Sequence, residues 1–145
     1  MNHHRIARWL LGALALFMAP TALQATFTPR AWFDDFPLGR GWISAGDQVY
    51  DEHLVRDVGV LFLSLIVVTL WSVVTGRGLV PVAIAWLVQG SLHLVYHVGH
   101  LDGLGGADKA ALVASLVSVP VFAAAALFLA RPSAAPTPGS SAASS

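Results

Sequence analysis

The fold is decided by residues 54–98, LVRDVGVLFLSLIVVTLWSVVTGRGLVPVAIAWLVQGSLHLVYHV, in which two apolar blocks flank a tight turn. The blocks cover residues 54–74 and 79–98, and each has about the 20 residues that a helix needs to cross a bilayer. The turn, Thr75-Gly76-Arg77-Gly78, is short, and helices joined by so few residues pack as antiparallel neighbours. This stretch therefore predicts a hairpin of two membrane-spanning helices.

Two further blocks, residues 6–25 and 110–130, have the same apolar character. Backbone groups inside a bilayer must find partners within their own segment, so each block is predicted to be a helix. The expected fold is all-α, an integral membrane bundle of four helices over residues 1–131 with an outer loop at 26–53. Residues 132–145, PSAAPTPGSSAASS, are small, polar and Pro-rich, and we expect a disordered tail there.

The composition excludes several classes of protein. Of the 145 residues, 56% are hydrophobic and 11% are charged, whereas about 25% of the residues in a soluble domain are charged. The 8 Lys and Arg balance the 8 Asp and Glu, so the chain has no basic field for nucleic acid, and its expected surroundings are a lipid bilayer. The absence of cysteine excludes disulfides, thiolate nucleophiles and thiolate metal sites.

Charged residues in the flanks of the blocks predict the orientation. Four arginines flank the blocks at one end of the expected bundle: Arg5, Arg8, Arg77 and Arg131. Most of the acidic residues lie in the loops at the other end. Because Lys and Arg mark the cytoplasmic side, both termini are predicted inside, in a bacterial inner membrane.

Residues 6–25 also have the character of a signal peptide, because a basic start and an apolar core end in the small residues ALQA. Leu23 is a poor residue three positions from the end of a segment cut after Ala25, so a retained helix is favoured. Cleavage would leave three spans in the same orientation.

Polar residues gather in two segments at the outer end of the hairpin. In residues 50–57, YDEHLVRD, two pairs lie four residues apart, His53 with Asp57 and Glu52 with Arg56, and each pair shares one helix face. In residues 89–102, the side chains of Gln89, His93, His97 and His100 follow one another at steps of four, four and three. Counting outward from the turn at equal helical rise places the two segments at the same depth, so we expect them to meet.

A divalent-metal site is the sharpest hypothesis for these residues, because imidazole and carboxylate groups suit zinc, iron, manganese or copper(II). The candidate ligands are His53, Asp57, His93, His97, His100 and Glu52. Groups expected to orient the ligands or to form ion pairs are Arg56, Asp102, Tyr96 and Gln89. Two imidazoles four residues apart on a helix can share one ion.

Other interpretations of the same residues stay open. The charged pairs can be helix-end ion pairs, and Gln89 and His93 can hydrogen-bond between helices. The protein would then be a non-catalytic accessory or structural subunit that docks a membrane partner, for which the small residues 123–126 offer a close-packing surface. Haem, quinone and proton-linked roles of the imidazoles also stay open. A b-type haem ranks below a simple metal, because it needs two axial histidines across an apolar slot and only Val60 and Leu61 stand level with His93. The chain contains no nucleophile elbow or nucleotide signature.

The first outer loop is rich in aromatic residues: Trp32, Phe33, Phe36, Trp42 and Tyr50. Aromatic side chains are enriched at the membrane–water interface, so an aromatic belt is the favoured interpretation. The alternative is a lid that lies over the polar cluster.

Residues 37–59, PLGRGWISAGDQVYDEHLVRDVG, and residues 93–105, HLVYHVGHLDGLG, together resemble a group of small bacterial membrane proteins. These carry an Asn/Asp-Glu-His-Leu-x-Arg-Asp-x-Gly motif after a Gly-Trp loop, and a His-rich end to the next hairpin helix. The resemblance covers most of the chain from Trp32 to Gly106. Its matched positions are Glu52, His53, Arg56, Asp57, Gly59, His93, His97, His100 and Asp102. It implies a four-span fold and brings no established activity.

Overall fold

The structure, a computed structural model, describes residues 3–130, which fold into helices alone. In order they are α1 (His3–Phe27), α2 (Pro29–Asp35), α3 (Glu52–Thr75), α4 (Leu79–Val98) and α5 (Gly106–Ala130). The four longer helices are each long and apolar enough to cross a membrane, which confirms an all-α protein of the multi-pass membrane class. The tail expected at 132–145 lies outside the described residues.

The ends of the hairpin helices follow from local sequence. The Asp51 carboxylate caps α3 by accepting a hydrogen bond from the backbone N–H of Leu54 at 3.1 Å. The helix ends at Gly76 and α4 begins after Gly78, and both glycines have left-handed backbone with φ of 72° and 69°. Side chains other than glycine rarely adopt this conformation, so the two glycines let the chain reverse within three residues.

The segment expected to be an outer loop at 26–53 contains a helix that was not predicted, α2. Pro29 stands in its first turn, where a fixed φ and a missing N–H cost nothing. Trp32 and Phe33 are buried, and they pack with Ala25 and Val55 into a small core of their own. A helix of 7 residues is too short to show a clear apolar period, which is why the sequence pattern did not reveal it.

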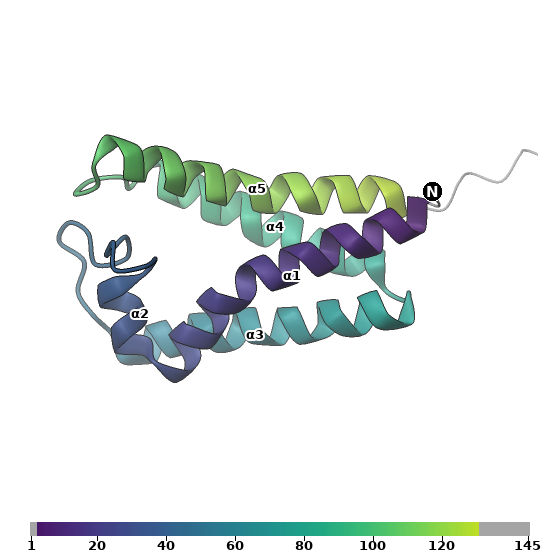
Figure 1. Ribbon diagram of the computed structural model, residues 1–145, viewed down its shortest axis with the longest axis horizontal. Coiled ribbons are helices and arrows are strands. Elements are labelled where there is room, and N and C mark those ends of the chain that lie inside the picture. Colours follow the sequence, from purple (N-terminus) through teal and green to yellow (C-terminus); the bar gives the residue numbers. More distant parts are fainter. Residues whose placement is uncertain (1–2, 131–145) are drawn as a thin grey trace, which may run out of the picture.

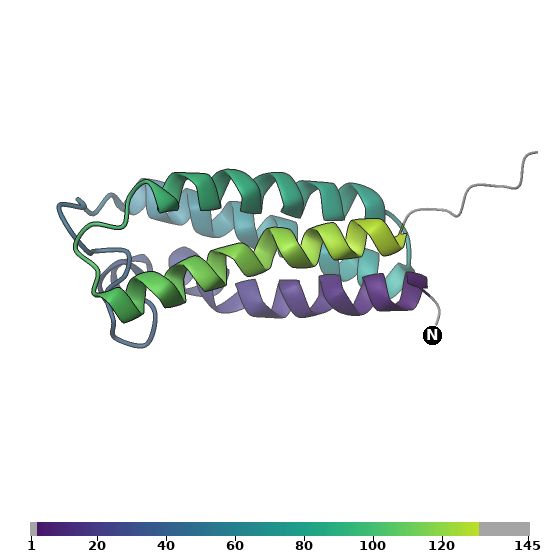
Figure 2. The same cartoon turned by 90° about the horizontal axis from the view of Figure 1, so that it is seen from above.

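The four long helices lie lengthwise along the bundle, and successive ones run in opposite directions (Figures 1 and 2). α1 packs chiefly against α3 and also against α5, whereas α4 packs chiefly against α5. The hairpin partners α3 and α4 share a smaller interface, where the buried indole Nε1 of Trp86 donates a 2.8 Å hydrogen bond to Thr69 Oγ1. The two main helix pairs depend on glycine, because Gly59 of α3 touches the backbone of α1 and Gly90 of α4 lies against Pro120 of α5.

The two ends of the bundle differ. We call the end that carries the α3–α4 turn the turn end, and the end that carries α2 and the loops at 36–51 and 99–105 the loop end. At the turn end α1 lies beside α5 and also contacts α3, through Arg8; toward the loop end α1 moves away from α5 and stays close to α3 (Figure 1). The four helices therefore enclose a continuous core at the turn end. Toward the loop end, α1 and α3 diverge from α4 and α5 (Figure 1).

Candidate functional site

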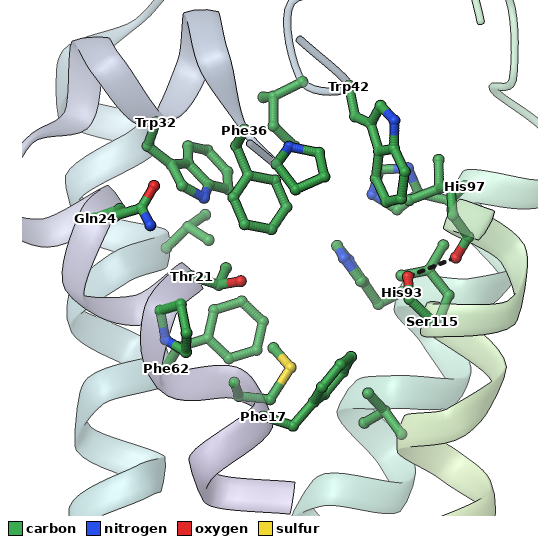
Figure 3. Close-up of a pocket in the computed structure, with 18 of the residues that line it drawn as sticks. Phe17, Thr21, Gln24, Trp32, Phe36, Trp42, Phe62, His93, His97 and Ser115 are labelled. Carbon is green, nitrogen blue, oxygen red and sulfur yellow. Dashed lines mark hydrogen bonds between the residues drawn. The ribbon is translucent and has the colours of Figure 1, made fainter. Parts of the chain in front are cut away.

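A pocket of about 680 Å³ occupies the space where the helices diverge at the loop end (Figure 3). Residues of α1, α2 and α3 line one side, and residues of α4 and α5 line the other. Small-molecule sites in proteins have volumes of roughly 300–1,000 Å³ and mostly apolar walls with a few placed polar groups. The size of this pocket is therefore typical of a ligand site.

The walls of the pocket are apolar and rich in aromatic rings. The aromatic side chains among them are Phe17, Trp32, Phe36, Trp42 and Phe62, and the imidazoles of His93 and His97 lie across the pocket from Trp32 (Figure 3). Among the described residues that line the pocket there is no Lys, Arg, Asp or Glu. The interior is thus suited to an uncharged molecule, because moving a net charge into an apolar pocket is costly without a partner of opposite charge.

Two imidazoles enter the pocket from α4. The buried positions of this helix, from Leu79 through Ala83, Trp86 and Gly90, continue at the same helical period to His93 and His97. The two rings lie edge to face with their centroids 4.4 Å apart, and His93 also meets the ring of Phe62 at 6.4 Å. Within residues 3–130, neither imidazole makes a hydrogen bond, so their nitrogens are free to contact a ligand.

Two other polar groups of the pocket lack partners. The indole Nε1 of Trp32 and the amide Oε1 of Gln89 are buried and make no hydrogen bond with any described residue. Both side chains line the pocket, Trp32 from α2 and Gln89 from α4. A buried polar atom without a partner costs about 1–3 kcal/mol, so a ligand that supplies partners would be bound more tightly than one that does not.

The loop at 36–51 lies over the pocket. Phe36, Pro37, Leu38, Trp42 and Ile43 contribute to its lining. The loop is fastened to the first turn of α5, because Arg40 Nε and Trp42 Nε1 both donate to Asp108 Oδ1, at 2.6 and 2.8 Å. Of the aromatic residues in α2 and this loop, Trp32, Phe36 and Trp42 line the pocket, whereas Phe33 and Tyr50 do not. Trp32 also packs in the small core with Phe33, so it joins that core to the pocket wall.

The polar residues of α3 lie elsewhere. Arg56 Nε donates to Glu52 Oε1 at 2.8 Å, and its terminal nitrogen donates to the carbonyl oxygen of Thr26 at 2.7 Å. His53 Nε2 lies 3.4 Å from Asp57 Oδ2, with side chains 90% and 58% exposed. The pairing of these residues at steps of four is confirmed, and none of the four lines the pocket.

The expectation that the two polar segments meet is therefore wrong. The face of α3 that turns inward carries Val55, Gly59 and Phe62, which places His53 and Asp57 on another face of the same helix. Within the described residues 3–130, no three His, Asp or Glu side chains lie close enough to hold one metal ion. Helical rise predicts how far along the bundle a residue lies, but it does not specify which face of the helix the residue occupies.

The remaining candidates lie at the surface of the loop end. His100 follows the end of α4, its Nδ1 lies 2.7 Å from the carbonyl oxygen of Tyr96, and the two rings stack with centroids 4.3 Å apart. Both residues are exposed and neither lines the pocket, and Asp102 is exposed in the next loop. Of the ten candidates, the structure places His93, His97 and Gln89 in the pocket.

Sequence reasoning did not assign to the site the polar residues that α1, α2 and α5 bring to the pocket, although it considered Trp32 as part of a lid. These are Thr21, Gln24, Trp32 and Ser115. Gln24 in an otherwise apolar block was the available signal, comparable to the Gln89–His93–His97 stripe. Comparison of the chain with protein-family models, with curated proteins and with solved structures found no match.

Proposed function

We propose that this protein binds a lipid-soluble small molecule in the pocket at the loop end of its bundle. The observation that carries the proposal is the combination of an apolar cavity of about 680 Å³ with buried polar atoms of Trp32 and Gln89 that have no protein partner. Apolar surface attracts an apolar molecule, and the unpartnered atoms reward one that also carries polar groups.

The lining also offers a route from the lipid phase. Leu16 and Phe17 of α1 line the pocket and are 71% and 53% exposed, so one edge of the pocket reaches the outer surface of the bundle. In a helix of this composition the exposed apolar surface is in contact with lipid tails. A molecule dissolved in the bilayer would thus enter sideways, without passing the loop at 36–51.

Photolabelling tests this proposal. The purified chain in lipid nanodiscs is exposed to an aliphatic diazirine label, and the labelled peptides are identified by mass spectrometry. We expect label on residues of the pocket such as Ser115. Leu116→Trp, which fills the pocket, should remove that label, whereas the neighbouring and more exposed Val117→Trp, outside the lining, should keep it. Equal labelling in both variants would exclude the pocket as a binding site and favour a purely structural or accessory subunit.

We place the loop end on the outer side of a bacterial inner membrane. Arg8 at the turn end donates to the last carbonyl oxygens of α3, at 2.6 Å to Val73 and 3.1 Å to Val74, so the start of α1 and the α3–α4 turn share one end. Arg5 and Arg77 lie at the same end, and arginines next to spans mark the cytoplasmic side. The pocket would then open to the outer half of the bilayer.

A divalent metal is the second candidate ligand, and the edge-to-face pair His93 and His97 favours it. Two imidazoles four residues apart can bind zinc, iron, manganese or copper(II), with further ligands from water or a bound molecule. Metal analysis of the purified protein tests this: stoichiometric metal that is lost in His93→Ala/His97→Ala and kept in His53→Ala/His100→Ala supports a site in the pocket. Metal-free wild-type protein contradicts it.

A further inference from the structure

The polar atoms of the pocket indicate that its ligand carries hydrogen-bonding groups in addition to apolar surface. We infer that the occupant is a quinone or quinol with an apolar tail, that is, a flat uncharged ring with oxygen atoms on opposite edges. This inference rests on the proposed function, because it names the class of molecule that the same pocket would take.

The first step is charge. The described residues that line the pocket include no Lys, Arg, Asp or Glu to balance a charged head group. Fatty acids and polyprenyl phosphates carry anionic head groups, and every phospholipid carries a charged phosphate, alone or beside an ammonium group; all of these charged groups would lose their hydration here without gaining a counter-charge from the lining. Neutral heads remain, and among membrane-soluble molecules quinones and quinols have such a head.

The second step is shape. Rings surround the centre of the pocket, with Phe36 and Trp42 above it, Phe62 and Phe17 below it, and His93 beside it (Figure 3). Aromatic side chains pack on planar rings face to face or edge to face, and each such pair adds to the stabilisation that burial alone provides. A planar ring would find contacts in this pocket that a saturated chain does not.

The third step is the position of the hydrogen-bonding groups. Trp32 and His93 lie on opposite walls of the pocket (Figure 3). The Trp32 indole is 8% exposed, and its N–H is an unpartnered donor that neighbouring side chains cover. A shift of the ring on binding would bring this N–H to one quinone oxygen. A neutral imidazole offers one donor and one acceptor, so His93 or His97 can donate to a carbonyl on the far edge or accept from a hydroxyl there.

Gln89, on the same α4 wall, offers an acceptor for the reduced form of the ligand, the quinol. The Gln89 Oε1 is an acceptor without a partner that neighbouring atoms cover, so the amide would turn to accept a hydrogen bond from a quinol hydroxyl. The α4 wall thus serves both forms, with imidazole donors for the quinone and imidazole or amide acceptors for the quinol. The apolar tail has a way out along Leu16 and Phe17 into the lipid.

Competition against the diazirine label tests the inference on the full chain in nanodiscs. The competitors are a para-benzoquinone with a short prenyl tail, its quinol, the same prenylated ring without oxygens, and a long-chain fatty acid. We expect the quinone and the quinol to displace the label from the pocket at concentrations about two- to tenfold below that of the oxygen-free ring, since each neutral hydrogen bond adds a modest net gain. The fatty acid should be the weakest competitor.

Variants then assign the contact. Trp32→Phe keeps an aromatic ring and removes the N–H, so it should weaken displacement by the quinone about two- to tenfold and leave the oxygen-free ring unchanged. Trp71→Phe, on the exposed surface of α3 and outside the lining, is the matched control and should change neither.

The outcomes separate the two proposals. If the oxygen-free ring competes as well as the quinone, or the fatty acid competes better, the inference is overturned while binding in the pocket stands. If the label never reaches the pocket, the proposed function itself fails. The comparison of competitors on the unchanged protein needs no variant, so the inference can be overturned even where Trp32→Phe does not fold.

Discussion

The indole Nε1 of Trp42, in the loop over the pocket, donates a 2.8 Å hydrogen bond to the carboxylate of Asp108, 66 residues further along the chain. Arg40 Nε binds the same oxygen at 2.6 Å, so a single side chain at the start of α5 holds two residues of the loop. Asp108 lies in the first turn of α5, where an acidic side chain suits the helix dipole. Its role as the anchor of the loop needed the structure.

The loop should open when this anchor is removed. Asp108→Ala takes the acceptor from both Arg40 and Trp42, so we expect amide hydrogen exchange across residues 36–50 to become several-fold faster while exchange within α3 and α4 stays unchanged. Asp108→Asn, which retains a carbonyl acceptor for Trp42, should have an intermediate effect. The control is Asp47→Ala, an exposed acid of the same loop. Unchanged exchange in Asp108→Ala would show that other contacts hold the loop.

The buried hydrogen bond between Trp86 and Thr69 should stabilise the α3–α4 interface. Both side chains are fully buried, and Thr69→Val preserves shape while leaving the indole N–H without an acceptor. We expect the free energy of unfolding to fall by about 1–3 kcal/mol. Thr75→Val is the matched control. Like Thr69, which donates to the carbonyl oxygen of Leu65, Thr75 donates to a backbone oxygen one turn back, but Thr75 is exposed. Unfolding in mixed detergent micelles measures both.

A double-mutant cycle isolates the bond itself. When Trp86→Phe is added to Thr69→Val, the unpartnered donor is gone, so the second change should cost less than it does alone. We expect a coupling energy of about 0.6 kcal/mol, and no more than about 1.7, as found for hydrogen bonds between membrane helices. Strict additivity of the two changes would mean that the bond contributes nothing to stability.

Gly59 should tolerate no side chain. A Cβ there would lie 2.5 Å from the backbone nitrogen of Thr26 and 2.8 Å from the carbonyl carbon of Ala25, so α1 and α3 would have to separate. We expect Gly59→Ala to lower the free energy of unfolding by about 1–3 kcal/mol. Gly12→Ala tests the opposite sign, because its Cβ would meet only Val73 at 3.8 Å and alanine favours a helix by about 1 kcal/mol over glycine. Equal effects at both positions would contradict this account of the α1–α3 contact.

The four long helices could be predicted because each depends on a run of its own residues. Apolar length specifies a span, and Asp51, Gly76 and Gly78 mark the ends of the hairpin helices by local chemistry. Which helices pack most closely depends on surfaces far apart in sequence. The short turn indicated that α3 and α4 are neighbours. Yet α3 packs more closely on α1, where Gly59 leaves room, and α4 packs more closely on α5, where Gly90 leaves room. The contacts of both glycines join residues far apart in sequence, so their partners could not be predicted from the pattern around them.

The α4 side of the pocket could be predicted from the sequence, whereas the opposite side could not, because that side depends on contacts between distant segments. The Gln89–His93–His97 stripe stood out because polar groups on one face of an apolar helix need a reason, and these side chains do line the pocket. The side chains opposite them were misassigned, because helical rise gives depth and not direction. The wall that faces His93 comes from Trp32 in a helix too short to predict, and from Phe62, an apolar residue that no pattern distinguished from its neighbours.

The orientation of the protein in the membrane can be tested directly. Because the chain has no cysteine, a single introduced cysteine is the one thiol that a maleimide can label. Leu38 is fully exposed in the loop over the pocket, and Thr75 is exposed at the turn end. We expect a membrane-impermeant maleimide to label Leu38→Cys in cells whose outer barrier has been opened, and to label Thr75→Cys only after the inner membrane is lysed. The physical reason is the arginines at the turn end, which resist transfer across the bilayer. The reverse pattern would place the pocket in the cytoplasmic half, and a ligand would then have to reach it from the inner leaflet.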